Sequence, residues 1–398
     1  MNIWRHLMLS QKNIDTIKAT IPILEENGVA LTKHFYDRMF RHNPEVKKFF
    51  NTSRQKNSSQ PEALAVAILA YAKNIENLEV LGNAVELIAQ KHASLQIKAE
   101  HYPIVGFNLI ESIKEVLDLN DNDDIVIAWT EAYNLLAEIL INREKSIYEE
   151  NLEHYGWNNF KEFEVIKKEN ESINTYSFYF KNNLFRRYDF KPGQYITVRV
   201  PYNGTTTMRN YSISSATGED YIRITVKREG QGYVSQYLSH EIKVGDRIEI
   251  APPCGEFFLE VNKNLDKPIV LISAGIGITP LMSMLLSELK TQNQRQILFV
   301  CGKKNINEHP FAKMLEKLSN ENPRLKTIFF YEDNSESDAK QGLVCIHTVQ
   351  QQLSEDKNDA QYFFCGPKEF MLSIHEKLLK NGVREKNIHY EFFGSKTA

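Results

Sequence analysis

The chain has little cysteine, little net charge and no apolar segment at its N-terminus. Its four cysteines show no CxxC spacing, so the sequence predicts neither a zinc site nor a disulfide framework and fits a reduced, cytoplasmic setting; they are Cys254, Cys301, Cys345 and Cys365. The formal net charge of -3 gives no reason to expect nucleic acid or an anionic membrane as the main partner. Residues 1–7 lack the apolar run of a signal peptide.

One stretch is apolar enough to be tested as a membrane span. Residues 268–287 contain no charged side chain and are long enough to cross a bilayer as a helix. However, the glycine- and proline-containing segment 273–280 interrupts the stretch, and β-branched residues precede it. The pattern therefore predicts a buried strand, a turn and a helix, and the protein is expected to be soluble, with no membrane insertion.

Three patterns of apolar residues divide the 398 residues, which are too many for one core. Helical spacing extends over 14–149, short alternating segments follow from 176 to 250, and from 268 apolar runs alternate with helical segments. We expect a multidomain α + β + α/β protein. Its predicted parts are an all-α domain at 8–148, a first linker at 148–159, an antiparallel β-barrel at 159–264 and an α/β parallel-sheet nucleotide-binding domain at 265–398.

His92 closes an apolar helical face on which Leu81, Val85 and Ile88 precede it at helical intervals. A histidine in this position has two interpretations, a metal ligand or a packed core residue. Tyr36 lies on another apolar helical face, where ordinary packing is the alternative to a functional role.

Glu144 and Tyr102 are the other two unusual positions of the helical region. Glu144 extends the apolar face of residues 129–140, where a carboxylate is costly unless it is paired. Alternatively, the helix end frays and Glu144 pairs in solvent with Arg143 or Lys145. Tyr102 lies at the inner edge of a third face, and simple packing also explains it.

Motifs of the second half suit a flavin and a nucleotide. Residues 209–212 (RNYS), at a predicted strand start, combine an arginine for a pyrophosphate, an aromatic ring for stacking and a serine. Residues 275–280 (GIGITP) lie between a predicted strand and a helix, where parallel sheets bind nucleotides, although a tight turn without a ligand is an alternative. Residues 365–367 (CGP) repeat that arrangement at a later strand end.

In this order, and followed by FFG at 392–394, the motifs resemble the ferredoxin-NADP reductase superfamily from about residue 160 to the C-terminus. The resemblance implies FAD, bound by Tyr195, Arg209, Asn210, Tyr211 and Ser212, with Phe392, Phe393, Gly394 and Ser395 closing over the flavin. It also implies NADH or NADPH, bound by Gly275, Ile276, Gly277, Ile278, Thr279, Pro280, Cys365, Gly366 and Pro367.

Together with HFYDRMF at 34–40, AQKHAS at 89–94 and AYNLLAEILINRE at 132–144, these motifs resemble the flavohaemoglobins over about residues 8–394. The resemblance implies a globin domain with haem b. It assigns His92 as the proximal iron ligand, Tyr36 as the distal donor, Gln60 and Leu64 as the distal wall, Phe50 as packing on the haem, Tyr102 and Glu144 as the proximal hydrogen-bonding pair, and Lys91 as a residue that tunes the haem and flavin potentials.

The resemblance implies a nitric oxide dioxygenase that converts nitric oxide and dioxygen to nitrate at a haem, which is re-reduced by NAD(P)H through FAD. This reaction would detoxify nitric oxide. Two alternatives remain: a haem gas sensor or oxygen carrier whose reductase keeps the iron ferrous, and a haem-lacking flavin reductase. A monomer is expected. No residue for the 2′-phosphate of NADPH stands out, so neither nucleotide is preferred.

The sequence departs from the family pattern at four places. Residues 1–7 precede the usual start, for which Met8 is the equivalent. Pro61 follows Gln60 and biases it away from helical geometry. Phe392 stands where the family often has cysteine and Ser395 where it often has proline, so both are expected to affect the flavin potential.

Overall fold

The computed structural model describes residues 9–50, 59–261, 266–333, 339–353 and 357–393. Contacts divide the chain into two compact units; the first is built on residues 1–159 and the second on residues 160–200 and 209–394. Gly394 and Ser395, predicted at the flavin, lie outside the described residues, as do residues 1–8 around the predicted start. Among the described residues, no helix is both long and apolar enough to span a membrane.

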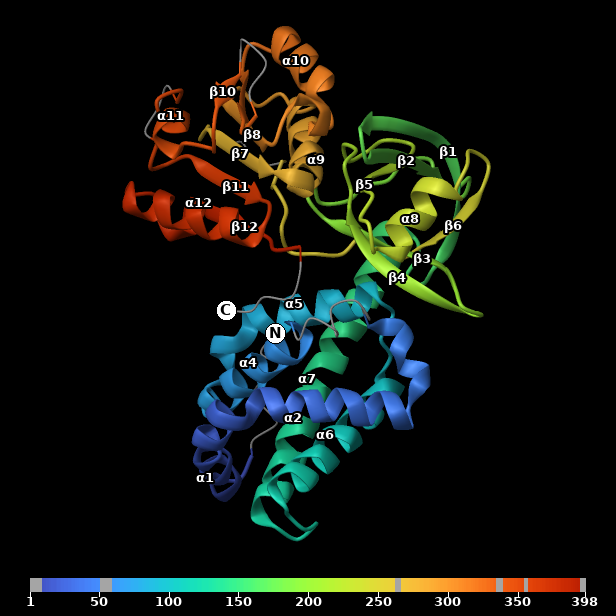
Figure 1. Cartoon of the computed structure of the whole chain (residues 1–398), viewed down its shortest axis with the longest axis vertical. Coiled ribbons are helices and arrows are strands. Elements are labelled where there is room, and N and C mark those ends of the chain that lie inside the picture. The colour runs from blue at the N-terminus through green and yellow to red at the C-terminus, as the bar shows by residue number, and fades with distance from the viewer. Residues whose placement is uncertain (1–8, 51–58, 262–265, 334–338, 354–356, 394–398) are drawn as a thin grey trace. The chain divides into compact units, whose positions relative to one another are not determined.

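The described residues of 9–159, which make up most of the first unit, form helices and connecting turns and contain no strand (Figure 1). Its elements are α1 (Gln11–Ala19), α2 (Ile21–His42), η2 (Pro44–Phe49), α4 (Ser59–Lys73), η3 (Leu78–Leu81), α5 (Gly82–Ser94), η4 (Ala99–His101), α6 (Tyr102–Leu117) and α7 (Asp124–Tyr155). Ser10 caps α1 by accepting a hydrogen bond from the Asn13 backbone. The core includes Phe35, Met39 and Trp129, on the apolar faces that the helical spacing predicts.

Two local expectations for this unit are wrong. The linker predicted at 148–159 is mostly helix, because α7 continues to Tyr155 and buries Ile147 and Asn151; it ends at Gly156, whose φ of 78° is available to glycine at low cost. Gln60 is helical although a proline follows it. Pro61 lies in the first turn of α4, where a helix does not need its N–H, so the usual bias against helix does not prevail.

The second unit begins with a six-stranded sheet in the order β4-β3-β6-β1-β2-β5, with antiparallel pairing described for β1–β2, β1–β6, β2–β5 and β3–β6. An antiparallel bridge joins Ile213, just after β4, to Ile224 on β5, and so connects the two edges as a barrel requires. The strands are β1 (Lys161–Ser172), β2 (Thr175–Lys181), β3 (Tyr195–Tyr202), β4 (Thr205–Ser212), β5 (Ile222–Lys227) and β6 (Arg247–Ile250), and α8 (Tyr233–His240) lies between β5 and β6.

The remainder of this unit is a parallel sheet in the order β10-β9-β8-β7-β11-β12. Its elements are β7 (Ile269–Ala274), η5 (Gly275–Gly277), α9 (Ile278–Leu289), β8 (Ile297–Lys303), η6 (Ile306–Glu308), α10 (Ala312–Glu321), β9 (Leu325–Tyr331), β10 (Lys340–Gln341), α11 (Ile346–Gln350), β11 (Gln361–Cys365), α12 (Lys368–Lys380), η7 (Glu385–Asn387) and β12 (Ile388–Tyr390). One core packs α9 and α10 on one face, and a second packs α11 and α12 on the other (Figure 1). The fold class is confirmed.

Candidate functional site

The first candidate site joins three helices through His92. His92 lies in the last turn of α5, Tyr102 begins α6 and Glu144 lies within α7. The Nδ1 atom of His92 is 2.8 Å from Oε1 of Glu144 and 3.1 Å from the Tyr102 hydroxyl. The Tyr102 hydroxyl also donates to Oε1 of Glu144. Residues that are far apart in sequence therefore form one hydrogen-bonded cluster.

The proton positions in this cluster follow from the chemistry of the three groups. Oε1 of Glu144 accepts from the Tyr102 hydroxyl, and it also accepts from His92 in the tautomer that carries its proton on Nδ1. The proton on Nδ1 leaves Nε2 with its lone pair, which is the form of imidazole that ligates a metal. Among the described residues, Nε2 of His92 has no hydrogen-bond partner.

Burial strengthens the cluster. Glu144 is 2% exposed, so the alternative that its helix end frays and it pairs in solvent is wrong. Arg143, the partner suggested by that alternative, instead binds Glu86 and Glu150. Desolvation, followed by the nearby Glu144 carboxylate, raises the pKa of Tyr102 well above its usual value, so its phenol stays a donor.

The backbone of Tyr102 is also held in place. The Tyr133 hydroxyl donates to the Tyr102 carbonyl over 2.6 Å. This approach needs Gly106, because a Cβ at that position would lie 2.3 Å from the Tyr133 ring. Tyr133 was not predicted as a site residue, and its place on the apolar face of α7 gave no signal of this bond.

A second group of predicted residues lies on α2, η2 and α4. The rings of Tyr36 and Phe50 are 5.7 Å apart, edge to face, and both pack against the core with Leu64. Burial raises the pKa of the Tyr36 hydroxyl, which has no hydrogen-bond partner among the described residues. The buried Oε1 of Gln60 is also unpartnered there, which is unusual for a buried polar atom.

The start of α4 is fixed against α2 by one bond, from the Thr32 hydroxyl to the Pro61 carbonyl over 2.8 Å. This bond places Gln60 on a helix turn that is held against the helix of Tyr36. Lys91, next to His92 in sequence, is exposed on α5.

The RNYS motif lies at the end of β4, not at the strand start that the sequence predicts. Asn210 accepts a bond of 3.3 Å from the Thr197 hydroxyl on β3, and Ser212 is buried. Burial raises the pKa of Tyr211, whose hydroxyl has no partner among the described residues. Tyr195, at the start of β3, packs close to Gly255, where a Cβ would lie 2.8 Å from its ring.

The two predicted nucleotide motifs meet at the carboxyl ends of β7 and β11. A Cβ on Gly277 would lie 2.2 Å from the carbonyl oxygen of Cys365, so only glycine allows this approach. Thr279 and Pro280 are buried in the first turn of α9, while Pro367 precedes α12. The structure thus brings GIGITP and CGP together at the sheet edge where nucleotides bind.

Lys303 is a residue of this region that the sequence analysis missed. It ends β8, is 4% exposed, and donates from Nζ to the carbonyl oxygen of Gly275. Desolvation lowers its pKa to about 8. A lysine that ends an apolar strand run beside the glycine turn was the available signal. Lys303, Gly275 and Pro367 line one pocket.

Phe392 and Phe393 follow β12. The Phe392 ring packs edge to face on Tyr390 at 5.6 Å and joins the core beneath α12, whereas Phe393 is 41% exposed. An exposed aromatic beside a packed one is suited to covering a planar ligand.

Three family models match the chain. They describe a globin over residues 33–140, an oxidoreductase FAD-binding domain over 162–259 and an oxidoreductase NAD-binding domain over 271–376. The flavohemoprotein of Rhodopirellula baltica is 43% identical, across 98% of this chain and 98% of that protein. That of Bacillus cereus is 41% identical, across 97% of this chain and 98% of that protein.

Two solved structures are similar to this chain in fold. A flavohemoglobin from Malassezia yamatoensis, with bound FAD and heme, matches with a TM-score of 0.86 at 26% identity, over 97% of this chain and 100% of that one. The FAD/NAD binding domain of a nitric oxide dioxygenase from Vibrio cholerae matches with a TM-score of 0.54 at 34% identity, over 59% of this chain and 99% of that one.

The fold and the histidine–carboxylate site define a globin joined to an oxidoreductase of the FAD- and NAD-binding class. Identity of about two residues in five over nearly the whole length leads to a more specific conclusion. The chain belongs to the flavohemoprotein family.

Proposed function

We propose that this chain is a nitric oxide dioxygenase that uses haem b, FAD and NADH or NADPH to convert nitric oxide and dioxygen to nitrate, and so detoxifies nitric oxide. The observation that supports it most is the buried Glu144 carboxylate on Nδ1 of His92. A carboxylate at that nitrogen increases the electron density that the imidazole gives to a metal, which favours oxygen chemistry over oxygen storage.

The residues of the helical unit fit a haem. His92 offers a single free Nε2, and no group of three or more His, Cys, Asp or Glu side chains gathers among the described residues to hold a bare ion. One imidazole suits iron whose other ligands come from a porphyrin. Among the described residues, the buried Oε1 of Gln60 has no hydrogen-bond partner, and the Tyr36 hydroxyl lies buried. Both are polar groups that a bound ligand would pair.

Each residue then has a defined task. Haem, when bound, supplies the iron at which dioxygen is activated. Tyr36 would be the hydrogen-bond donor on the distal side, and Gln60 with Leu64 would form the distal wall. Glu144 and Tyr102 fix the orientation of His92 and its Nδ1 proton. Phe50 would pack on the porphyrin, and Lys91, next to His92 in sequence, would adjust the potentials through its charge.

The second unit would supply electrons. FAD, when bound, accepts a hydride from the nicotinamide and releases its two electrons singly. Tyr195 and residues 209–212 would hold the flavin, with residues 392–395 closing over it; residues 275–280 and 365–367 would hold NADH or NADPH. The proposed domain bounds are 8–148, 159–264 and 265–398, and the proposed state is a cytoplasmic monomer.

The test is the product of turnover. Purified holoprotein with NADH, dioxygen and nitric oxide should form nitrate, and removal of dioxygen should abolish rapid nitric oxide consumption. Nitrous oxide or nitrite as the main aerobic product would contradict the proposal. A sensor or oxygen carrier would consume no NAD(P)H in the steady state when nitric oxide is added.

The role of Tyr36 is tested by Tyr36→Phe, which removes the distal donor and should raise the dioxygen dissociation rate by about tenfold or more, since a charge-assisted bond contributes about 1.5–3 kcal/mol. Tyr71→Phe is the matched control. Its hydroxyl donates to the Ala132 carbonyl over 2.9 Å, so its loss affects stability and not dioxygen retention. Equal dissociation rates in Tyr36→Phe and wild type would remove Tyr36 from the distal site.

A further inference from the structure

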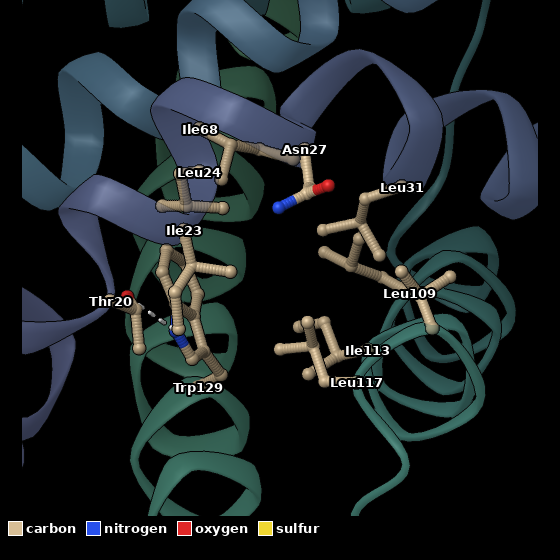
Figure 2. Close-up of a pocket in the computed structure, with 11 residues that line it drawn as sticks. Thr20, Ile23, Leu24, Asn27, Leu31, Ile68, Leu109, Ile113, Leu117 and Trp129 are labelled. Atoms are coloured by element: carbon tan, nitrogen blue, oxygen red, sulfur yellow. Dashed lines mark hydrogen bonds between the residues drawn. The ribbon is translucent and has the colours of Figure 1, made fainter.

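Two pockets of the chain differ in the charge of their walls. The first lies in the helical unit between α2, α6 and α7, and none of the residues that line it is charged (Figure 2). The second lies in the second unit, at the carboxyl ends of β7 and β8. Its wall contains three lysines and two glutamates, which are Lys227, Lys303, Lys304, Glu308 and Glu332. Because the positive charges outnumber the negative ones, the second pocket is suited to an anionic ligand.

The ammonium group of Lys303 is buried in the wall of this second pocket. The residue is 4% exposed, and among the described residues its Nζ donates to one acceptor, the carbonyl oxygen of Gly275. An ammonium group has three N–H donors, so two of them have no partner in the described part of the chain. No carboxylate of the described residues lies within ion-pair distance of this Nζ. A buried charge is costly unless it is paired, so Lys303 needs a counter-ion that these residues do not supply.

Neighbouring side chains do not compensate the charge of Lys303. Glu308 on η6 attracts it, but this carboxylate forms an ion pair over 3.8 Å with Lys227, which repels Lys303. Cys301 on β8 is neutral, because burial raises the pKa of its thiol to about 11. Burial also lowers the pKa of His309 well below its usual value, so its imidazole is neutral. The Lys303 charge is therefore left to a ligand.

Two exposed groups complete the wall around Lys303. Lys304 follows it in sequence and adds a positive charge, and Glu332 follows β9 and adds a negative one. Desolvation lowers the pKa of Lys303 to about 8, so the ammonium form still dominates at pH 7 although burial penalises it. A buried charge that is retained at a pocket wall against such a penalty is typical of a functional site.

The position of Lys303 links it to the glycine turn. It ends β8 directly after Gly302, which pairs with Ala274 at the end of β7. Its Nζ holds the carbonyl of Gly275, the first residue of GIGITP, which has a φ of 53°. A glycine turn at the carboxyl edge of parallel strands is where nucleotide phosphates bind. The pocket volume of about 210 Å³ is more than tenfold the roughly 10–15 Å³ that one water needs, which leaves room for a phosphate group.

We propose that Lys303 binds a phosphate group of the nicotinamide nucleotide, which supplies its counter-ion. The inference rests on the proposed use of NADH or NADPH. Phosphate oxygens are negatively charged and are strong acceptors, so they pair both the buried charge and the two remaining N–H donors of Lys303. The group is either the pyrophosphate, which both nucleotides carry, or the 2′-phosphate, which only NADPH carries.

Titration calorimetry with NAD⁺ and NADP⁺ is the direct test, because oxidised full-length holoprotein binds them without turnover. Lys303→Met keeps a side chain of similar length without the charge, and it should weaken nucleotide binding by about tenfold or more, as expected for the loss of charge-assisted bonds. Lys313→Met, at an exposed position of α10 that does not line the pocket, is the matched control and should bind as wild type does. Weakening that includes NAD⁺ assigns the pyrophosphate, and weakening of NADP⁺ alone assigns the 2′-phosphate. Wild-type affinity for both nucleotides would overturn the proposal.

Stability distinguishes a binding role of Lys303 from a structural one. An unpaired buried charge penalises the fold, so Lys303→Met should be more stable to urea than wild type at pH 7 while it binds nucleotide less tightly. Loss of stability together with affinity would assign a structural role and contradict the proposal. Lys303→Gln keeps an N–H donor without the charge, and it serves if Lys303→Met does not fold. It should also weaken the nucleotide, and wild-type affinity in this variant would equally overturn the proposal.

The failures of the two proposals are distinguishable, because nucleotide binding is measured without nitric oxide. If nitrate is not the product but Lys303→Met still weakens the nucleotide, the assigned reaction is wrong and the role of Lys303 stands. If nitrate forms and Lys303→Met binds nucleotide as wild type does, only the inference about Lys303 fails.

Discussion

Replacing Glu144 by glutamine keeps the shape of the side chain and removes its charge. Oε1 of Glu144 accepts from Tyr102 and, at 2.8 Å, from His92. A bond to an ionised group contributes about 1.5–3 kcal/mol and a neutral one about 0.5–1.5 kcal/mol, so the change weakens the two bonds by about 2 kcal/mol together. If that loss is expressed in the transition state, the rate falls by about 30-fold.

The assay is the rate of nitric oxide consumption by haem-loaded protein in air, with haem content measured for each variant. Reduction of a soluble acceptor by the flavin serves as an internal reference and should stay unchanged. Glu149→Gln is the matched control, because Glu149 is exposed on the same helix and lies 4.0 Å from Lys145. Wild-type rates in Glu144→Gln at equal haem content would refute the reasoning about the proximal carboxylate.

Two further predictions concern the reductase unit. Gly277→Ala places a Cβ 2.2 Å from the Cys365 carbonyl oxygen, so it should cost about 1–3 kcal/mol of stability and raise the KM for NADH. Gly82→Ala is the control, because nothing lies within 4 Å of its added Cβ, and it should change neither stability nor KM. An unaltered KM in Gly277→Ala would contradict the close packing of Gly277 against Cys365. Lys303 has a pKa of about 8 in the folded protein, against the ordinary lysine value of 10.5 that applies to the unfolded chain. Burying its charge therefore penalises the fold fully below pH 8, and urea unfolding should show stability rising by about 3 kcal/mol as pH increases from about 8 to about 10.5. Lys303→Met should lack this rise in stability. Identical pH profiles for Lys303→Met and wild type would contradict the claim that the buried Lys303 charge causes the rise.

The helical face around His92 was predictable because each helix buries one stripe. His92, Tyr102 and Glu144 each follow from residue spacing on one helix. The hydrogen-bonded cluster that the three residues form could not be predicted in this way, because it depends on how α5, α6 and α7 pack. The choice between a paired Glu144 and a frayed helix end needed the burial of that side chain, which is 2% exposed.

Strands with few buried residues were the hardest to predict. In β1 only Phe163 and Val165 are buried, and the other positions are largely charged or polar, so its alternation is faint. In β4 Met208 and Ser212 alone are buried, which explains why RNYS was placed at a strand start. The strands of the parallel sheet were easier, because both of their faces are buried and they form continuous apolar runs.

The close approach of Gly277 to Cys365 shows a different limit. The two motifs are far apart in sequence, and only the parallel order of β7 and β11 brings their carboxyl ends together. The motifs predict a nucleotide-binding site at the carboxyl ends of the strands, whereas the need for glycine at position 277 follows only from the packing.

The most direct measurement is the ratio of nitrate formed to nicotinamide oxidised. Nitric oxide, dioxygen and one electron balance to one nitrate ion, and a hydride supplies two electrons. The account predicts two nitrate ions for each NADH or NADPH consumed in air, and no rapid consumption without dioxygen. Nicotinamide oxidation with little nitrate, at saturating nitric oxide and dioxygen, would contradict it.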